Sequence, residues 1–446
     1  MQYVLPKRRG LVQIQKYSSV LFGRAVLFRV EGIIMQKNLE FQEAARLLAQ
    51  QVQPVSMEYV PLPASLGRVL GETVRAGSDV PPFDRSPFDG YAFRGEDSKD
   101  ALPERPVTLR ILEEIPAGSV GKKRVVRGTA AKILTGAPIP LGADCVCKFE
   151  DTEFTETSVT LHKAYRSGSN IVLRGEDLTA GDVVAEQGMV IDCALMGTLA
   201  TQNLAEPKVY RRPLVGIITT GSELCSVGEM LTGGKIVNSN RYTFQGVLQN
   251  AGCVTEFFGC PGDTVEEIAA ALSQAAQACD VIITTGGVSA GDYDLTPDAL
   301  TAAGGTVLMQ NMQLKPGGKC CFGSIGKTLV CCLSGNPASS MTAFYAAVLP
   351  AIRKLCGRKN WALEQIPVTL LEDFPKKSPK PRLLRGKLEL SGGTVGMHIT
   401  GEQGNGILHT LVGCNVLALV PPGSGPLPKG TVLQGFWIDG TNGGTQ

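Results

Sequence analysis

The sequence has few histidines and no Cys-x-x-Cys pair, and both shortages restrict the chemistry that we expect from it. Its three histidines, His162, His398 and His409, lie too far apart for the spacing of a zinc site, and they argue against a histidine-based catalytic triad. The thirteen cysteines stand mostly among Val, Leu and Phe. We interpret them as reduced core residues of a cytoplasmic protein, with a metal site as the alternative.

Signals for nucleic acid, nucleotides and membranes are also missing. The formal net charge of +2 gives no reason to expect non-specific nucleic-acid binding. No Gly-x-Gly-x-x-Gly follows a predicted strand, and the Gly-Lys-Thr at 326–328 has Cys321 where a P-loop needs its first glycine. Because Arg24 and Arg29 interrupt the early apolar runs, we expect neither a signal peptide nor a membrane span. The chain should therefore have no nucleic-acid partner and no membrane partner.

What the chain does have is length and a globular composition. At about 150 residues per domain, its 446 residues predict roughly three domains, and its 43% hydrophobic and 19% charged content is typical of a soluble protein. Apolar residues at helical spacing over 38–52 open the first folded unit, whereas residues 1–34 show no fold signal. We hypothesise that translation starts at Met35 and that residues 1–34 are a non-native or disordered extension. The intact mass of the natively expressed protein tests this.

From Pro213 onward, predicted strands and helices alternate every 20 to 30 residues. The pattern predicts strands beginning near Leu214 and Asp280, with helices over 239–251, 264–278 and from about 337 to 356. Such alternation indicates βαβ units with right-handed crossovers. It predicts an α/β domain built on a parallel sheet that is covered on both faces.

Glycine-containing loops follow three of these strands, at Gly221-Ser222, Gly286-Gly287 and Gly335-Asn336. The carboxyl ends of parallel strands lie on one edge of an open sheet, where ligands bind. Helix N-termini and the positive charges of Lys315 and Lys319 would make that edge favourable for binding phosphate or another oxyanion. Asp292 and Asp294 follow the second loop and suit a hydrated divalent cation, although a turn with a helix-capping aspartate is the alternative.

Short strands dominate two other parts of the chain. Residues 107–162 alternate in the way of a small β domain, and 367–437 predict a second one, for which a partly closed barrel is one candidate form. Within the first, Thr135 offers a hydroxyl in a Gly-Pro loop. Asp89, in the Asp-Gly pair that precedes the strands, has ordinary turn chemistry as its simplest interpretation.

Seven motifs in order give the chain a family resemblance: PPFDRSPFDGYA, LTGAPIP, RGEDL, TTGSEL, TTGGVSAGDYD, KPGGK and LSGNPAS. With these it resembles the molybdopterin molybdenumtransferases of the MoeA type, which include the C-terminal part of gephyrin. The likeness covers about Met35 to Trp437. It implies a multidomain α/β plus β fold: a first domain split between 35–79 and 171–212, an inserted β domain at 80–170, a molybdopterin-binding α/β domain at 213–361 and a C-terminal β domain at 362–446.

The resemblance also implies a reaction and a set of site residues. Molybdate is inserted into the dithiolene of adenylated molybdopterin, AMP is released with Mg²⁺, and a homodimer forms the site, with Asp89, Thr135 and Asp177 reaching it from the partner subunit. By the same resemblance the catalytic residues are Asp294, Glu223, Lys315 and Asp89, and the metal ligands are Asp263 and Asp294. The implied substrate-binding residues are Thr135, Asp177, Ser222, Gly286, Gly287, Ser289, Lys319, Gly335, Asn336, Pro337, Ser339, Arg385 and Asn405.

Three departures from the family pattern keep alternatives open. Arg85-Ser86-Pro87-Phe88 replaces the usual Asn-Ser-Ala-Met, Gly318 shifts the second lysine by one residue to Lys319, and Asn405 stands where serine is common. A lineage variant or a tungstate-specific paralogue would explain them equally. A molybdopterin adenylyltransferase and a non-catalytic scaffold are the other functions considered, and the adenylyltransferase of the same pathway is a candidate partner.

Overall fold

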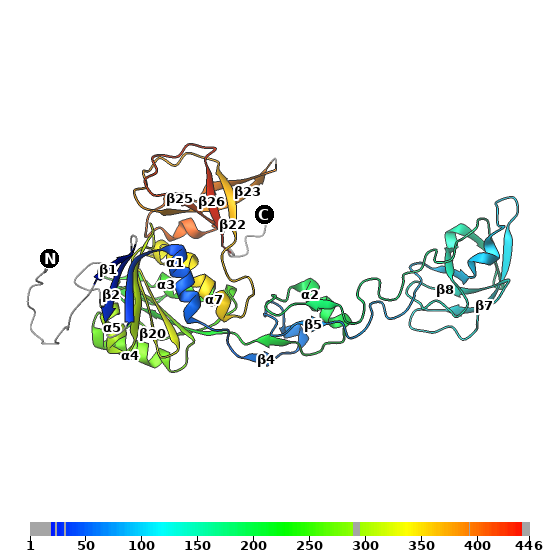
Figure 1. The fold of residues 1–446 in the computed structure, drawn as a ribbon, viewed down its shortest axis with the longest axis horizontal. Coiled ribbons are helices and arrows are strands. Elements are labelled where there is room, and N and C mark those ends of the chain that lie inside the picture. Colours follow the sequence, from blue (N-terminus) through cyan, green and yellow to red (C-terminus); the bar gives the residue numbers. More distant parts are fainter. Residues whose placement is uncertain (1–18, 23–24, 31–32, 289–294, 392, 439–446) are drawn as a thin grey trace, which may run out of the picture. The chain divides into compact units, whose positions relative to one another are not determined.

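The structure, a computed structural model, describes residues 19–22, 25–30, 33–288, 295–391 and 393–438 (Figure 1). The chain forms two compact units. The first contains Met1–Glu58, Gly67–Val69 and Val209–Gln446, and the second contains Tyr59–Leu66 and Leu70–Lys208. The short strands β4 (Met57–Tyr59) and β13 (Lys208–Tyr210) stand where the chain passes from one unit to the other. No helix among the described residues is both long and apolar enough to cross a membrane.

A mixed nine-stranded sheet forms the centre of the first unit. Its strands, in spatial order, are β1 (Ser19–Phe22), β2 (Ala25–Val30), β3 (Ile33–Glu40), β19 (Thr306–Gln313), β20 (Cys320–Ile325), β21 (Thr328–Leu333), β18 (Val281–Thr285), β14 (Leu214–Thr219) and β17 (Val254–Phe257). Strands β21, β18, β14 and β17 run parallel, as the sequence predicts. The sheet is not wholly parallel, because β19, β20 and β21 follow one another as antiparallel neighbours without a crossover helix.

Helices cover both faces of this sheet. They are α1 (Phe41–Gln51), α3 (Ser239–Asn250), α4 (Val265–Ala276), α5 (Thr296–Ala302), α6 (Pro337–Ala343) and α7 (Leu349–Leu355). Successive residues of β18 point to opposite faces, so Val281 and Ile283 join the core under α1, α3 and α7, while Ile282 joins the core under α4 and α5. A strand buried on both faces accounts for the uninterrupted apolar run in the sequence.

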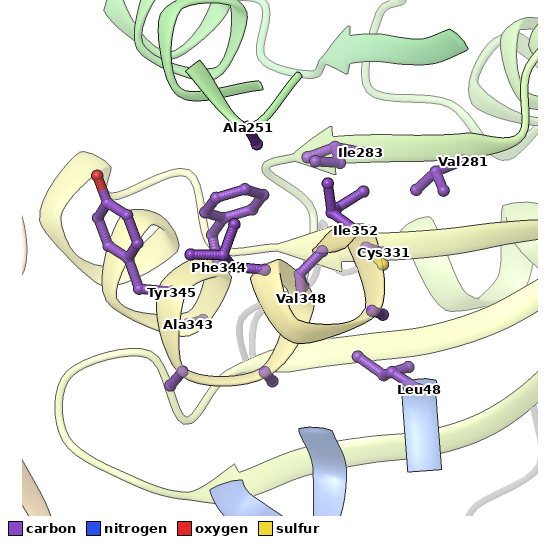
Figure 2. Close-up of a cluster of buried hydrophobic side chains, with 14 of the residues drawn as sticks. Leu48, Ala251, Val281, Ile283, Cys331, Ala343, Phe344, Tyr345, Val348 and Ile352 are labelled. Carbon is purple, nitrogen blue, oxygen red and sulfur yellow. The ribbon is translucent and has the colours of Figure 1, made fainter. Parts of the chain in front are cut away.

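Helices α6 and α7 are joined by one π-helical turn, η4 (Phe344–Val348). Pro350, at the start of α7, has no backbone N–H to continue the α-helical ladder, which accords with the widened turn before it. Figure 2 shows Phe344, Val348 and Ile352 directed toward Ile283 and Cys331 of the sheet. Burying side chains of this size stabilises the fold by about 1.5–3 kcal/mol each.

The amino-terminal segment differs from the sequence expectation. Strands β1 and β2 precede Met35, and β1 pairs with β2, which pairs with β3, although no folded element was predicted there. Strand β3 pairs with β19, and α1 packs against α7, so residues 33–51 lie in the first compact unit. Pairing between residues so distant in the sequence leaves no local signal. The start at Met35 stays a prediction.

A closed five-stranded barrel completes the first unit. Its strands, in order, are β22 (Gln365–Leu370), β24 (Thr394–Ile399), β23 (Arg382–Ser391), β25 (Val416–Val420) and β26 (Val432–Trp437). Leu384 points into the barrel, whereas its neighbour Leu383 belongs to the core that includes the large sheet. Phe41 of α1 meets Phe436 of β26 edge to face, with 5.4 Å between ring centroids. These contacts fix the barrel against the α/β part.

The second unit contains a six-stranded sheet of order β10-β11-β7-β8-β6-β9. Its strands are β10 (Thr152–Phe154), β11 (Ser158–Leu161), β7 (Val107–Ile115), β8 (Thr129–Ile133), β6 (Gly90–Phe93) and β9 (Cys145–Lys148). Tyr91 and Phe93 belong to one core cluster and Ala92 to another, so both faces of β6 are covered. The unit also holds the paired strands β5 (Val74–Arg75) and β12 (Val183–Ala185) and the helix α2 (Cys193–Thr201).

Candidate functional site

A cleft of about 800 Å³ opens at the carboxyl ends of β14, β18 and β21 in the first unit. The loops that follow these three neighbouring parallel strands all line it, as the sequence predicts from strand topology. Of the expected site residues, the structure brings eight together there: Ser222, Glu223, Asp263, Gly286, Gly287, Gly335, Asn336 and Pro337.

The middle loop depends on two glycines in left-handed conformations. Gly286 has φ +105° and Gly287 has φ +63°. A Cβ on Gly286 would lie 2.3 Å from the Thr220 hydroxyl oxygen, and one on Gly287 would lie 2.4 Å from that of Thr296. Thr296 also donates a hydrogen bond of 3.1 Å to the Gly286 carbonyl. The loops after β14 and β18 therefore approach each other more closely than any residue with a side chain allows.

Two carboxylates line the cleft: Asp263 in the segment between β17 and α4, and Glu223 in the loop after β14. Asp263 accepts a hydrogen bond of 3.2 Å from the Ser222 amide, which fixes its side chain beside that loop. Glu223 follows at once and precedes the short parallel pair β15 (Leu224–Cys225) and β16 (Ile236–Val237). Lys235 donates its ammonium to the Ser222 carbonyl and so holds this pair to the loop.

Two helix N-termini face the cleft, and one of them was missed as a site element. The sequence treats 238–240 only as the cap of α3, yet Asn238 and Asn240 line the cleft. Asn240 is 8% exposed and donates 2.9 Å to the Gly335 carbonyl, while its own side-chain oxygen has no partner within the described structure. A buried, unsatisfied amide oxygen beside two helix N-termini is a group that a polar ligand can satisfy.

The barrel contributes a loop to the same cleft. Gly406 lines it beside Asn336, and the neighbouring Asn405 accepts 3.0 Å from the Ser339 amide in the first turn of α6. Ser339 in turn accepts 3.1 Å from the Gly317 amide through its hydroxyl oxygen. The 315–319 segment, α6 and the 401–406 loop thus meet at one point.

Arg385 is a fully buried basic residue at this junction. Its guanidinium donates 2.7 Å to the Thr410 hydroxyl and 3.0 Å to the Gly404 carbonyl, and burial lowers its pKa from the ordinary value. One guanidinium nitrogen, Nη1, has no partner among the described residues. Arg385 therefore holds the 401–406 loop through its hydrogen bond to Gly404, and its Nη1 remains as a donor nitrogen for an oxyanion.

The two lysines of the 315–319 segment are both exposed, and neither lines the cleft. Backbone bonds hold Lys315 against the start of β23: its amide donates 2.9 Å to the Pro381 carbonyl, and its carbonyl accepts 3.0 Å from the Leu383 amide. Lys319 stands one residue before β20. Both residues therefore belong to the segment next to the cleft and not to its lining.

The remaining expected residues fall outside this site. Asp89, Thr135 and Asp177 belong to the second unit. There, Asp89 accepts 2.6 Å from the Thr135 amide and 2.8 Å from its hydroxyl, and these bonds hold the pKa of Asp89 below its ordinary value. Ser289 and Asp294, like Asp292, lie outside the described residues.

The donors present fit a magnesium ion only in part. No group of three or more His, Cys, Asp or Glu side chains able to hold a metal occurs among the described residues. Glu223 and Asp263 nevertheless place two hard oxygen ligands on the same cleft wall. Mg²⁺ is commonly held by one or two carboxylates together with substrate phosphates and water, so this pair suits an ion that arrives with an anionic substrate.

Three family descriptions cover most of the chain. Residues 39–202 match the MoeA N-terminal region (domain I and II), residues 216–354 a probable molybdopterin binding domain, and residues 367–434 the MoeA C-terminal region (domain IV). The cleft loops lie in the second match, and Gly406 lies in the third.

Similar proteins cover nearly the same length. The chain is 34% identical over 396 residues to a molybdopterin molybdenumtransferase of Staphylococcus epidermidis, covering 89% of this chain and 94% of that protein, and 34% identical over 393 residues to one of Staphylococcus aureus, covering 88% and 94%. The crystal structure of a molybdopterin biosynthesis moeA protein from Pyrococcus horikoshii OT3 matches with a TM-score of 0.76 and 29% identity, over 90% of this chain and 100% of that one. Motifs, domain order and fold agree, and the chain belongs to the molybdopterin molybdenumtransferase (MoeA) family.

Proposed function

We propose that this enzyme inserts molybdate into the dithiolene of adenylated molybdopterin and releases AMP, as a step of molybdenum cofactor biosynthesis. The observation that carries the proposal is the cleft itself, where three strand-end loops, two helix N-termini and a barrel loop converge on about 800 Å³. Unobstructed amides and helix dipoles suit the phosphates of the adenylated substrate. The partner-free oxygen of Asn240 suits a polar edge of the same ligand.

The neighbouring junction is the proposed place of molybdate. Lys315 and Lys319 supply exposed cations, Asn405 an amide, and Arg385 one unpaired guanidinium nitrogen. Gly317 and Ser339 join this junction to the first turn of α6, whose residue Pro337 lines the cleft. An oxyanion held there would approach a pterin in the cleft without a covalent bond to any side chain, by positioning alone.

We further propose that Mg²⁺ is held by Glu223 and Asp263 together with substrate oxygens. When bound, the ion would offset the negative charge of the phosphoanhydride. The role proposed for Glu223 and Asp263 is to hold the ion and to orient the anhydride beside the loop after β14. We also propose a cytoplasmic location, which the absence of disulfides among the thirteen cysteines favours.

The experiment that tests the reaction follows AMP release from purified protein with adenylated molybdopterin, Mg²⁺ and molybdate, with tungstate in a parallel arm. Glu223→Gln should abolish release, while Glu266→Gln, which removes an exposed carboxylate in the first turn of α4, should not change it. Release no faster than without enzyme would end the proposal. Faster turnover with tungstate than with molybdate would identify a tungstate enzyme.

A homodimer is also proposed, with Asp89, Thr135 and Asp177 acting at the cleft of the second subunit. Mixing Asp89→Asn with Glu223→Gln protein tests it, because random dimers would restore one intact site in half of the molecules and so about a quarter of the wild-type activity. No restoration after verified subunit exchange would place all residues on one chain. The adenylyltransferase of the pathway is the proposed partner that delivers the substrate, and a pull-down with the purified enzyme tests that contact.

A further inference from the structure

A second pocket, of about 640 Å³, lies entirely within the second unit, and nothing in the proposed reaction uses it. Its floor is a row of lateral neighbours across three strands: Glu114 of β7 pairs with Lys132 of β8, which pairs with Tyr91 of β6. Directly paired residues project to the same face of a sheet. The six-stranded sheet, whose β7 and β8 are labelled in Figure 1, therefore carries a charged and aromatic patch on one face.

The pocket has an aromatic wall. Phe154, from the edge strand β10, lies 5.8 Å from the Tyr91 ring and 5.7 Å from the Phe149 ring, measured between centroids. Strand β10 is three strands removed from β8 in the sheet order, so the sheet must curl to bring these rings together. Phe154 remains 55% exposed, which leaves a flat apolar surface open to solvent beside the floor.

At the bottom of the pocket, Tyr91 offers a hydroxyl that no other group of the described residues bonds. Its side chain is 1% exposed and lines the pocket, and the described structure contains no hydrogen bond from its hydroxyl. Burial, with Cys147 and Glu114 as smaller causes, raises the pKa of Tyr91, so the phenol stays protonated and neutral near pH 7. The Tyr91 hydroxyl is therefore open to water or to a ligand in the pocket.

The charge of the pocket is negative. Three carboxylates, on Glu113, Glu114 and Glu156, line it together with the ammonium of Lys132. A second ammonium, that of Lys123, donates 2.8 Å to the carbonyl of the lining residue Leu112, and the Lys123 amide donates 2.6 Å to Glu113. The Lys132 ammonium lies 3.0 Å from the Glu114 carboxylate and 5.7 Å from the Phe149 ring centroid, so this surface already holds a cation between a carboxylate and a ring. Three carboxylates against two ammonium groups, together with the exposed Phe154 ring, favour a further cation that is flat enough to stack.

We propose that this pocket binds a guanidinium group, stacked on Phe154 and hydrogen-bonded to the glutamates and the Tyr91 hydroxyl. A guanidinium stacks on aromatic faces and donates two parallel bonds to one carboxylate, which a compact ammonium cannot do. The ligand is either a small guanidine or an arginine side chain of a partner protein. Both sources share the chemistry that the pocket recognises.

The test is calorimetric titration of the full-length protein with N-acetyl-L-arginine amide, which carries one positive charge and no other. The neutral citrulline analogue is its matched control, because it keeps the shape and removes the charge. Saturable binding of the arginine compound, with none of the citrulline compound, is expected. Equal binding of both, or no saturable binding of the arginine compound up to about 10 mM, would overturn the proposal.

Three variants locate the site. Tyr91→Phe removes only the hydroxyl, and Glu114→Gln removes one charge with little change of shape; each should weaken binding about tenfold, the size expected for a lost charge-assisted hydrogen bond. Glu104→Gln, an exposed carboxylate of the same unit that does not line the pocket, should leave binding unchanged. Unchanged binding in both pocket variants, with thermal unfolding as in the wild type, would refute the placement.

A comparison of two further probes identifies the source of the guanidinium. n-Butylguanidine, a free guanidine with one positive charge, and a capped Gly-Gly-Arg-Gly-Gly peptide of the same charge present the group without and with a flanking backbone. Tighter binding of n-butylguanidine would support a small-molecule ligand, whereas tighter binding of the peptide would support an arginine on a partner protein. If neither probe binds, the proposal is overturned, as it is when the arginine compound shows no saturable binding.

Discussion

Replacing Gly286 by alanine perturbs the tightest contact in the cleft. The added Cβ would lie 2.3 Å from the Thr220 hydroxyl oxygen and 2.6 Å from the Thr220 carbonyl oxygen, whereas ordinary contact begins at 3.4 Å. One of the two loops must therefore move by about 1 Å, and because one of the blocking atoms is backbone, a side-chain rotation cannot relieve the overlap. The φ of +105° adds strain of its own for any residue with a side chain.

The magnitude follows from these two terms. Strain at an unfavourable φ costs about 1–3 kcal/mol, and overpacking costs about 1–3 kcal/mol more, so we expect Gly286→Ala to lower the free energy of unfolding by about 2–5 kcal/mol. That corresponds to a fall in melting temperature of roughly 5–15 °C. Displacing catalytic groups by about 1 Å is expected to reduce AMP release about 100-fold at a temperature where the variant is folded.

Gly335→Ala is the matched control in the same cleft. Its Cβ would meet only Gly286, at 3.5 Å from the Cα atom, which is ordinary contact, and its φ lies outside the left-handed range. The melting temperature of this variant should stay within about 2 °C of the wild type. If Gly286→Ala melts and turns over like Gly335→Ala, the close approach of the two loops is not what the site requires.

Three other variants test the neighbouring residues. Lys315→Ala should raise the molybdate concentration needed for half-maximal rate much more than Lys319→Ala, because Lys319 stands one residue later than the second lysine of the family pattern; equal effects would contradict this. Asp263→Asn should raise the Mg²⁺ requirement in the AMP assay more than it raises the molybdate requirement, and the reverse would remove Asp263 from the proposed ion site. Thr135→Val removes one of the two donors to Asp89, so the pKa of Asp89, measured by carboxyl NMR, should rise toward its ordinary value, and an unchanged pKa would show that the backbone amide alone sets it.

The pH dependence of the Asp89 contact follows from the direction of its shift. The folded protein holds the pKa of Asp89 below the ordinary value of 3.8, so the stabilisation is complete above that value and is lost as the pH falls through the lower folded value. Between pH 5 and pH 8, Asp89 should therefore remain a carboxylate, and its titration should not shape the activity profile. A step in that range that disappears in Asp89→Asn would refute this.

Local sequence accounted well for elements whose signals are local. The caps of α3 and α4 are present as expected: Asn238 accepts from the Arg241 amide, and Thr264 accepts from the Glu267 amide. The capping box of α4 is incomplete, since the Glu267 carboxylate accepts from the Gly262 amide. Strand β3 shows where local signals end: besides its antiparallel neighbour β2, it pairs with β19, a strand far along the chain, and that pairing has no local pattern.

The sequence by itself determined the strand-end glycine loops, the order of the domains and the family, because turn chemistry, helix caps and spaced motifs are written in consecutive residues. Tertiary structure alone decided which residues meet: that Asn240 faces the cleft, that a barrel loop with Gly406 closes one side of it, and that Arg385 is anchored to that loop. It also decided that Phe154 lies over Tyr91. Such contacts depend on sheet curvature and on packing between distant segments, for which no local pattern exists.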